Sequence, residues 1–434
     1  MATNITPTSV LINPIPHALQ AVVEVPGSKS ITNRALLLAA LAGGTSRLVN
    51  ALDSDDSRFF MKALQDLGFS IIHEPENSEI KVKGLGGAIL PTEACLYIGN
   101  AGTAARFLTA FLTLGYGHFI LDGDQRMRNR PIGDLMHSLN QLGAKITPQN
   151  QQLKPACPPL EIHASGLRGG KTTIAGDISS QFLSALLIVA PYAAASVEIE
   201  LTTSLTSKPY IDMTIAVMSD FGVEISQHDY EIFQIVPGFY LPKDVYKIES
   251  DASAASYFFA APAICGGSVK VKDISRNSCQ GDIRFLEVLE KMGCVVEENN
   301  LEVTVSASAG LRGVDVDMGD FSDTAQTLAA VAPFASTPTC IRGIASSRLK
   351  ETDRISAVCA ELRKIGVRVD EHADGMTIFP CQNINGTSIQ TYQDHRMAMA
   401  FSLIGLRVPG MKIENPGCVS KTFPNYFNVL EGLR

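Results

Sequence analysis

Hydrophobic residues recur along the chain in a spacing that predicts the same amphipathic helix several times. Over residues 132–142 the apolar positions keep the period of a helix, and Gly143 suits the left-handed residue that ends one. The residues after it alternate between apolar and polar, which is typical of a half-buried strand. This pattern of helix, glycine and alternating segments recurs every 71 to 79 residues, at Gly68, Gly143, Gly222, Gly293 and Gly366. The chain therefore contains an internal repeat.

A second element alternates with the first: a short polar segment that opens a helix of small and apolar residues. It begins near residues 27, 99, 176, 250, 322 and 393, at intervals of 71 to 77 residues. A helix that is apolar on nearly every side, such as residues 182–190, has to be buried on every side. Together the two elements predict six units, each with a strand, an inner helix, a strand, an outer helix and two more strands.

The sixth unit is incomplete, because the sequence stops soon after its outer helix, "NYFNVLEG". We expect "SVLINPIP" and "AVVEVPG", near the N-terminus, to supply its two missing strands. Residues 1–28 and 249–434 then form one discontinuous domain and residues 29–248 a contiguous one, with hinges near 26–28 and 248–250. Each domain would hold three units, with sheets wrapped around buried helices. The alternative is an ordinary βαβ sandwich whose helices resemble one another by chance.

Composition narrows the function. With 434 residues, 45% of them hydrophobic, the chain is long enough for more than one domain. Its apolar runs are too short to span a bilayer and no export signal is visible, so we expect no membrane contact. Nine cysteines without a CxxC pair fit buried thiols in a reducing compartment, which predicts a cytoplasmic protein. Because the net charge is −8, the chain has no general attraction for nucleic acid, and an anionic ligand needs a local cluster of cations.

The first polar segment lies in "VPGSKSITNRALLLAAL" and raises the question of a phosphate-binding P-loop. A P-loop needs glycine six residues before its lysine and another directly before it, but those positions hold Val23 and Ser28. The P-loop is therefore excluded. A helix start still offers unpaired backbone N–H groups and the positive end of the helix dipole, which makes Lys29, Ser30 and Arg34 a candidate anion site. The alternative is a serine that only caps the helix.

Cations recur near the starts of other predicted helices, and carboxylates lie among them. Each cation alone would be a solvated surface charge, but together on an acidic chain they indicate a site for phosphates and carboxylates. An acid or base among cations suits proton transfer on an anionic substrate, although Asp251 and Asp394 also fit helix caps. No His, Cys and carboxylate set has the sequence spacing of a metal site, and no Gly-x-Ser-x-Gly elbow occurs. The cations are Arg106, Arg128, Arg130, Lys208, Lys350, Arg354, His395, Arg396 and Lys421, and the carboxylates are Asp251, Asp323, Glu351 and Asp394.

Nine segments, in order over nearly the whole chain, together resemble the 5-enolpyruvylshikimate-3-phosphate synthase family. They are "PGSKSITNRALLLAALA", "GNAGTAARFL", "RPIGDL", "GDISSQFLSALL", "SKPYIDMT", "RNSCQGDIRFLEVLEKMG", "LKETDRI", "DHRMAMAFSL" and "KTFPNYF". The resemblance implies a two-domain inside-out α/β barrel of the enolpyruvyl transferase type, made of six βαβαββ repeats with three in each domain. This agrees with the six units found from the repeat.

The resemblance also implies a reaction. The enolpyruvyl group of phosphoenolpyruvate would pass to the 5-hydroxyl of shikimate 3-phosphate, with release of phosphate, on the shikimate pathway to chorismate and the aromatic amino acids. Members of the family need no metal or cofactor, form no covalent enzyme intermediate and close their domains over the substrates. We therefore expect these two small molecules as partners and a monomeric enzyme.

Site residues are carried over by position from the family. Shikimate 3-phosphate is expected at Lys29, Ser30, Arg34, Ser179, Ser180, Gln181, Ser207, Asp323 and Lys350. Phosphoenolpyruvate is expected at Lys29, Asn100, Gly102, Arg130, Gln181, Arg354, Arg396 and Lys421. The expected catalytic residues are Lys29, Asp323, Glu351 and His395. Glu351 and Lys29 are the candidates for moving the proton at the methylene carbon, and Asp323 is the candidate base for the hydroxyl.

Two positions depart from the family pattern. Phe107 stands where many members have Pro, and Ser346 stands where several have Asn near the shikimate hydroxyls. Gly102 keeps the small side chain associated with sensitivity to glyphosate. One alternative is the sister transferase that acts on UDP-N-acetylglucosamine, which has Lys-Asn in place of Lys29-Ser30 and a reactive loop cysteine. The other is a catalytically inactive anion-binding module, although the candidate acid and base residues are all present.

Overall fold

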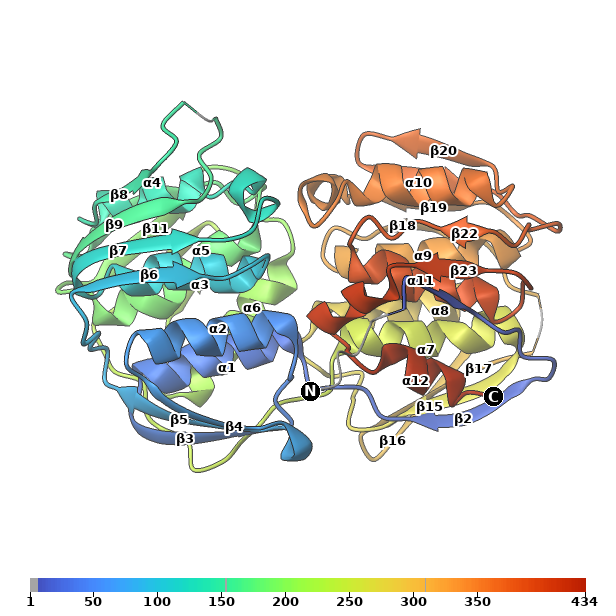
Figure 1. Cartoon of the computed structure of the whole chain (residues 1–434), viewed down its shortest axis with the longest axis horizontal. Coiled ribbons are helices and arrows are strands. Elements are labelled where there is room, and N and C mark those ends of the chain that lie inside the picture. The colour runs from blue at the N-terminus through green and yellow to red at the C-terminus, as the bar shows by residue number, and fades with distance from the viewer. Residues whose placement is uncertain (1–6, 153, 309) are drawn as a thin grey trace. The chain divides into compact units, whose positions relative to one another are not determined.

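The computed structural model describes residues 7–152, 154–308 and 310–434. The chain divides into two compact units, which are considered one at a time (Figure 1). Unit 1 combines Met1–Pro26 with Ser250–Arg434, and unit 2 is Gly27–Glu249. None of the helices in the described ranges combines the length and hydrophobicity that crossing a membrane requires.

The helices of unit 2 alternate between buried inner helices and half-buried outer ones. The inner helices are α1 (Lys29–Leu41), α3 (Gly102–Leu112) and α5 (Ser180–Val189), and the outer helices are α2 (Asp55–Asp66), α4 (Gly133–Gln141) and α6 (Lys208–Asp220). Nearly every residue of the inner helices is buried, whereas α2 buries one face. Helix α3 contacts both α1 and α5. The predicted inner and outer helices are therefore confirmed in this unit.

The strands of unit 2 form small sheets of one design, in which a parallel pair is extended by two antiparallel strands. One sheet runs β14 (Tyr246–Lys247), β3 (Gly43–Val49), β5 (Glu79–Leu85), β4 (Ser70–Glu74). A second runs β6 (Glu93–Tyr97), β7 (Tyr116–Asp122), β9 (Leu160–Ser165), β8 (Ile146–Pro148). A third runs β10 (Gly170–Ile174), β11 (Val197–Leu201), β13 (Ile232–Ile235), β12 (Ser226–His228).

Unit 1 repeats this design, except that one of its sheets has only three strands. Its inner helices are α7 (Ala252–Cys265), α9 (Ala325–Val331) and α11 (His395–Gly405), and its outer helices are α8 (Phe285–Met292), α10 (Arg354–Lys364) and α12 (Tyr426–Glu431). Its first sheet runs β2 (Leu19–Val23), β15 (Gly267–Val271), β17 (Glu302–Ala307), β16 (Val295–Asn299). Its second runs β18 (Asp315–Asp317), β19 (Thr339–Arg342), β21 (Gly375–Ile378), β20 (Val369–His372). Its third runs β22 (Ser388–Ile389), β23 (Lys412–Glu414), β1 (Ser9–Leu11). Because small sheets surround buried helices in both units, the alternative of an ordinary βαβ sandwich is wrong.

The glycines that marked the repeat end the outer helices as predicted. Gly68, Gly143, Gly222, Gly293 and Gly366 all have φ between +89° and +108°, in the left-handed region that other residues rarely adopt. The glycine signal in the sequence is therefore a direct consequence of how each outer helix turns into its strand.

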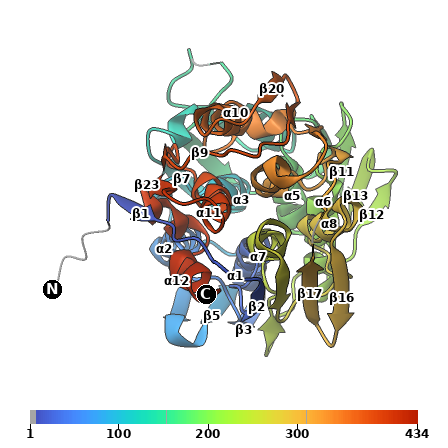
Figure 2. The same cartoon turned by 90° about the vertical axis from the view of Figure 1, so that its right-hand side faces the viewer.

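The prediction for the sixth unit is half right. Strand β1, in "SVLINPIP", pairs antiparallel with β23, with Ser9 opposite Glu414 (Figure 2). "AVVEVPG" instead provides β2, which pairs parallel with β15 in a different sheet, with Leu19 opposite Gly267. Strand β14, near the end of unit 2 in the sequence, pairs parallel with β3 in the same way as β2 pairs with β15. The prediction failed because the alternation of apolar residues shows which face of a strand is buried, but does not show which strand it pairs with.

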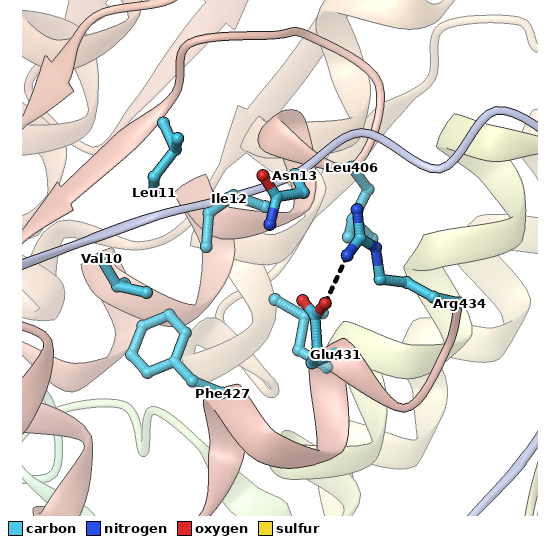
Figure 3. Close-up of a pocket in the computed structure, with 9 residues that line it drawn as sticks. Val10, Leu11, Ile12, Asn13, Leu406, Phe427, Glu431 and Arg434 are labelled. Atoms are coloured by element: carbon cyan, nitrogen blue, oxygen red, sulfur yellow. Dashed lines mark hydrogen bonds and ion pairs between the residues drawn. The ribbon is translucent and has the colours of Figure 1, made fainter.

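The N-terminal and C-terminal segments pack together inside unit 1. Val10 and Ile12 line a cavity of about 30 Å³ together with Phe427 and Leu430 of α12. Figure 3 shows Val10, Ile12 and Phe427 at this cavity. This volume is far below the roughly 300 Å³ at which small-molecule sites begin. The cavity is therefore a packing defect where the two ends meet, rather than a candidate ligand site.

Candidate functional site

Most of the predicted site residues of unit 2 lie at the starts of its helices. Ser28 caps α1 by accepting a hydrogen bond from the Ile31 N–H at 3.4 Å, so the capping function of this segment is present. Lys29 is the first residue of α1, and its Nζ lies 3.7 Å from Oδ2 of Asp56 on α2. The Lys29 side chain is 16% exposed. Lys29 therefore reaches the edge of the unit while Asp56 holds it in place.

Arg34, one turn further along α1, is buried and fixes α1 to the inner helix α5 and the outer helix α6. Its Nε donates to Oγ1 of Thr214 at 2.8 Å, and Nη2 donates to Oγ of Ser184 at 3.2 Å. Nη1 donates to the carbonyl of Ser30 at 3.0 Å. The guanidinium also lies over the ring of Phe107, 5.6 Å from its centroid. Arg34 thus positions the Ser30 backbone and joins α1, α5 and α6, and Phe107 fills the space behind it.

Arg130 lies beside the start of α3. Its Nη1 donates to Oδ1 of Asn100 at 3.2 Å and to the carbonyl of Asn100 at 3.4 Å. Gly102, the first residue of α3, faces the guanidinium so closely that a Cβ there would lie 2.5 Å from Nη2 of Arg130. On the same helix, Nη1 of Arg106 donates to the carbonyl of Gly102 at 3.1 Å. Asn100, Gly102 and Arg130 are therefore brought together. Their contact with phosphoenolpyruvate stays a prediction.

The predicted serines also lie at helix starts. Ser179 caps α5 by accepting from the Gln181 N–H at 3.3 Å, and Nε2 of Gln181 donates to Oγ1 of Thr103 on α3 at 3.3 Å. Ser180 is the first residue of α5. Ser207 precedes α6 with φ of +56°, in the left-handed region. Hydroxyls, an amide and helix N-termini from α3, α5 and α6 are thus available in unit 2 to an anionic ligand.

The predicted residues of unit 1 form one network of charges around Asp323. Its Oδ1 accepts from Nζ of Lys350 at 2.6 Å and from Nη1 of Arg354 at 3.0 Å. Its Oδ2 accepts from Nη2 of Arg396 at 2.6 Å. Asp323 lies in a short 3-10 turn, Ser322–Thr324, directly before α9, and its side chain is 17% exposed. Three cations from separate elements therefore converge on one carboxylate.

Arg354 links Asp323 to the other two carboxylates of the network. Its Nε donates to Oδ2 of Asp394 at 2.7 Å, and Nη2 donates to Oε2 of Glu351 at 2.9 Å. Lys421 extends the network, since its Nζ lies 3.5 Å from Oε1 of Glu351. We call Lys350, Arg354, Arg396 and Lys421, with Asp323, Glu351 and Asp394, the unit 1 cluster. Its four cations outnumber its three carboxylates, so the cluster retains positive charge for an anionic ligand.

Asp394 and His395 open α11. Asp394 caps the helix by accepting from the Arg396 N–H at 2.9 Å, so it has the capping function and also belongs to the cluster. His395 is 1% exposed, and its Nδ1 lies 3.6 Å from Oδ1 of Asp394. The side chain is almost completely buried, and its catalytic function stays a prediction.

Burial and neighbouring charges shift the pKa values of Asp323 and Lys350 in the cluster. Burial raises the pKa of Asp323, but Arg396, Lys350 and Arg354 outweigh it, so the pKa lies well below its usual range. Burial lowers the pKa of Lys350, against the opposing effect of Asp323. The cluster therefore contains a carboxylate held ionised by neighbouring cations and a lysine that gives up its proton more readily than usual.

Sequence reasoning missed Asp282, a buried carboxyl next to the cluster. Burial and the negative charge of Asp323 raise its pKa to about 6, against the opposing effect of Arg396. Its Oδ2 accepts a short hydrogen bond from Oγ of Ser253, which in turn lies 3.4 Å from Nη2 of Arg396. The only signal in the sequence was its place in "QGDIRF", within a segment that resembled the family.

Not every hollow of the molecule belongs to this chemistry. A hollow of about 840 Å³ on unit 1 is lined by residues that include Leu311, Phe334, Cys381 and Arg407. None of the predicted site residues lines it. It is therefore not a candidate for the predicted reaction.

Units in which small sheets surround buried helices, and in which the helix starts carry Arg, Lys, Ser and carboxylate side chains, define an enzyme for small phosphorylated and carboxylated substrates. The model of the family described as EPSP synthase (3-phosphoshikimate 1-carboxyvinyltransferase) matches residues 14–430. The chain belongs to this family. It catalyses the family's reaction, transfer of the carboxyvinyl group of phosphoenolpyruvate to shikimate 3-phosphate in the shikimate pathway, and is a target of glyphosate.

Relatives agree with this assignment. A 3-phosphoshikimate 1-carboxyvinyltransferase of Shewanella denitrificans is 50% identical over 93% of this chain and 94% of its own length. The enzyme of the same name from Trichormus variabilis is 49% identical over 96% and 97%. A solved EPSP synthase structure from Acinetobacter baumannii superposes with a TM-score of 0.82 at 26% identity, covering 98% of this chain and 97% of that one. The alternative of a UDP-N-acetylglucosamine transferase is not favoured.

Proposed function

We propose that the unit 1 cluster binds the anionic groups of phosphoenolpyruvate and that its carboxylates carry the protons of the reaction. The observation that supports this most strongly is the convergence of Lys350, Arg354 and Arg396 on Asp323, with Glu351 bonded to the same Arg354. Arg354 and Arg396 would bind carboxylate or phosphate oxygens as forks, and Lys421 as a point charge. Holding both substrates in position supplies much of the rate, because the bimolecular step becomes an oriented one.

Unit 2 would hold shikimate 3-phosphate through Lys29, the hydroxyls of Ser30, Ser179, Ser180 and Ser207, and the Gln181 amide. The support is their placement at the starts of α1, α5 and α6, where backbone N–H groups and the helix dipole favour an anion. Arg34 would act by fixing this arrangement, since its donors are bonded to Ser30, Ser184 and Thr214. Asn100, Gly102 and Arg130 would contribute the contacts of unit 2 to phosphoenolpyruvate.

The proton transfers follow the two halves of the reaction. In the addition, Asp323 accepts the proton of the 5-hydroxyl as oxygen bonds to C2 of phosphoenolpyruvate, and Glu351 or Lys29 delivers a proton to C3. In the elimination, the same group removes a proton from C3 as the C2–phosphate bond breaks and phosphate leaves. Lys350 would orient the hydroxyl beside Asp323, because its Nζ already lies 2.6 Å from Oδ1.

Glu351→Gln and Asp323→Asn test these roles against binding. Each variant keeps its size but loses the group that moves a proton, so kcat is expected to fall about 10²-fold or more. The dissociation constant of shikimate 3-phosphate, measured by calorimetry, is expected to change much less than kcat. Glu371→Gln is the control, because Glu371 is ion-paired with Arg348 in the same unit but lies outside the cluster. If kcat is unchanged in either cluster variant, that residue has no part in proton transfer.

We also propose that the enzyme works in the cytoplasm as a monomer. All nine cysteines are free thiols, which supports a reducing compartment. Every predicted site residue is on this one chain, so a second copy is not needed to complete the chemistry. Cell fractionation and light scattering of the purified protein test the two parts separately, and a stable dimer or an exported protein would contradict the corresponding part.

A further inference from the structure

Two histidines and a glutamate share one face of the sheet formed by β6, β7, β9 and β8 in unit 2. His118 of β7 is directly opposite His163 of the antiparallel β9. Glu161 precedes His163 by two residues and therefore points to the same face. The residues between them, Phe119 and Ile162, are completely buried. The three polar side chains are thus on the outer face, away from the core and from the helix starts that carry the predicted reaction.

The three side chains lie close enough together to share one ion. The imidazole rings of His118 and His163 are stacked, with centroids 4.6 Å apart and an angle of 20° between their planes. One ligand atom from each of His118, Glu161 and His163 lies within 4.8 Å of the others. In the described part of the chain, the buried Nε2 of His118 has no hydrogen-bond partner. A buried ring nitrogen without a partner is costly, and a bound cation would satisfy it.

Neighbouring residues complete the environment. Nε2 of Gln149 donates to Oε1 of Glu161 at 3.3 Å, which orients the carboxylate as an outer-shell partner does in metal sites. On the other side, the register of β6 places Glu93 opposite His118 and Cys95 opposite Ile120. Both are exposed on the outer face. Further oxygen and sulfur donors therefore lie one strand from the histidine pair.

We propose that His118, His163 and Glu161 bind one divalent transition-metal ion, with zinc as the ion that suits the site best. Two imidazoles and a carboxylate are a common donor set for Zn²⁺, and imidazole also binds Cu²⁺ and Ni²⁺. The ion would join β7 to β9 across the sheet and so stabilise unit 2. It takes no part in the transferase reaction. The competing explanation is that the two imidazoles simply stack across the strand pair.

Metal titration of the full-length, untagged, chelator-treated protein separates these explanations. Calorimetry with ZnCl₂ is expected to show one saturable site in the wild type. His118→Asn and His163→Asn should each weaken binding by about tenfold or more, because losing a direct ligand costs at least as much as losing an outer-shell partner. His228→Asn, at an exposed histidine on β12, is the control and should bind as the wild type does.

Two further measurements keep the test independent of folding. Co²⁺ bound at the site should give visible d–d absorption bands that disappear in both histidine variants. Zn²⁺ should raise the melting temperature of the wild type and leave the melting temperature of the double variant His118→Asn/His163→Asn unchanged. Glu161→Gln, which leaves the stacked rings intact, should also weaken binding. Equal zinc affinity in the wild type and the double variant, or no saturable binding, would overturn the proposal in favour of simple stacking.

Discussion

Gly102 is the position at which one added methyl group should affect catalysis without affecting stability. A Cβ at this position would lie 2.5 Å from Nη2, 2.7 Å from Nη1 and 2.8 Å from Cζ of Arg130. Ordinary contact begins at 3.4 Å, so the Gly102→Ala variant has to displace the guanidinium by about 0.9 Å. The backbone tolerates the change, since the φ of Gly102 lies outside the left-handed region. The displacement falls on the flexible end of Arg130, which can move at little cost in folding free energy.

The size of the effect follows from what that guanidinium does. It donates to Oδ1 and the carbonyl of Asn100 at 3.2 and 3.4 Å, bonds that a 0.9 Å displacement disrupts. A misplacement of about 1 Å in a positioning group can cost about 10²-fold in rate. If Arg130 binds phosphoenolpyruvate, we expect kcat/KM for phosphoenolpyruvate to fall by about 10²-fold, equivalent to about 2.7 kcal/mol of transition-state stabilisation. The KM for shikimate 3-phosphate should stay within about twofold of the wild type.

Steady-state phosphate release measures this, with each substrate varied at saturating levels of the other. Gly133→Ala is the matched control, because it also adds a methyl group at the start of a helix, α4, where the nearest atom would be 3.5 Å away. Both variants should melt at or slightly above the wild-type temperature, since Ala favours helix over Gly by about 1 kcal/mol. An unchanged kcat/KM for phosphoenolpyruvate in Gly102→Ala would refute the assignment of Arg130 to this substrate.

Two further predictions concern stability. Because the pKa of Asp282 is raised to about 6 in the folded state, its favourable contribution is present below about pH 4 and is lost as the pH rises through about 6. Asp282→Asn should therefore stabilise the folded protein against unfolding by urea, by up to about 3 kcal/mol at pH 8 and hardly at all at pH 4. An equal difference at both pH values would contradict the charge argument. A Cβ at Gly84 of β5 would lie 2.1 and 2.2 Å from the carbonyl oxygens of Ala42 and Ala39, so Gly84→Ala should lower stability by about 1–3 kcal/mol in thermal unfolding. Gly43→Ala, with its nearest atom 3.9 Å away, is the control and should be neutral, and equal melting points for the two variants would count against the close packing of β5 on α1.

Local signals in the sequence predicted much of the fold. The period of the outer helices and the glycine after each one are properties of neighbouring residues, so they could be read without knowing the partners. The pairing of β2 with β15 and of β14 with β3 could not be predicted in this way. It depends on residues such as Leu19 and Gly267 that are far apart in the chain. Strand alternation states which face is buried and leaves the neighbouring strand unspecified.

The candidate site was likewise predicted only in part from the sequence. Helix starts rich in Ser, Arg and Lys predicted where cations gather, and Asp323, Arg354 and Arg396 do lie together in unit 1. The sequence did not indicate that Arg34 points into the interior, because its partners Ser184 and Thr214 are 150 and 180 residues away. The pairing of His118 with His163 was hidden for the same reason, since only strand register brings them together. Spacing rules detect ligands on one element and miss ligands on neighbouring strands.

The charge balance of the unit 1 cluster bears directly on how Asp323 can act as a base. A carboxylate whose pKa is held well below its usual range by Arg396, Lys350 and Arg354 is a weak base. An anionic substrate that binds these same cations competes with Asp323 for their charge, so its arrival raises the pKa of the carboxylate. Basicity at Asp323 would then develop as the substrate binds. The proposed binding and proton-transfer functions are therefore coupled, because the cations proposed to attract the substrate are the ones that would hold the proposed base inactive until it arrives.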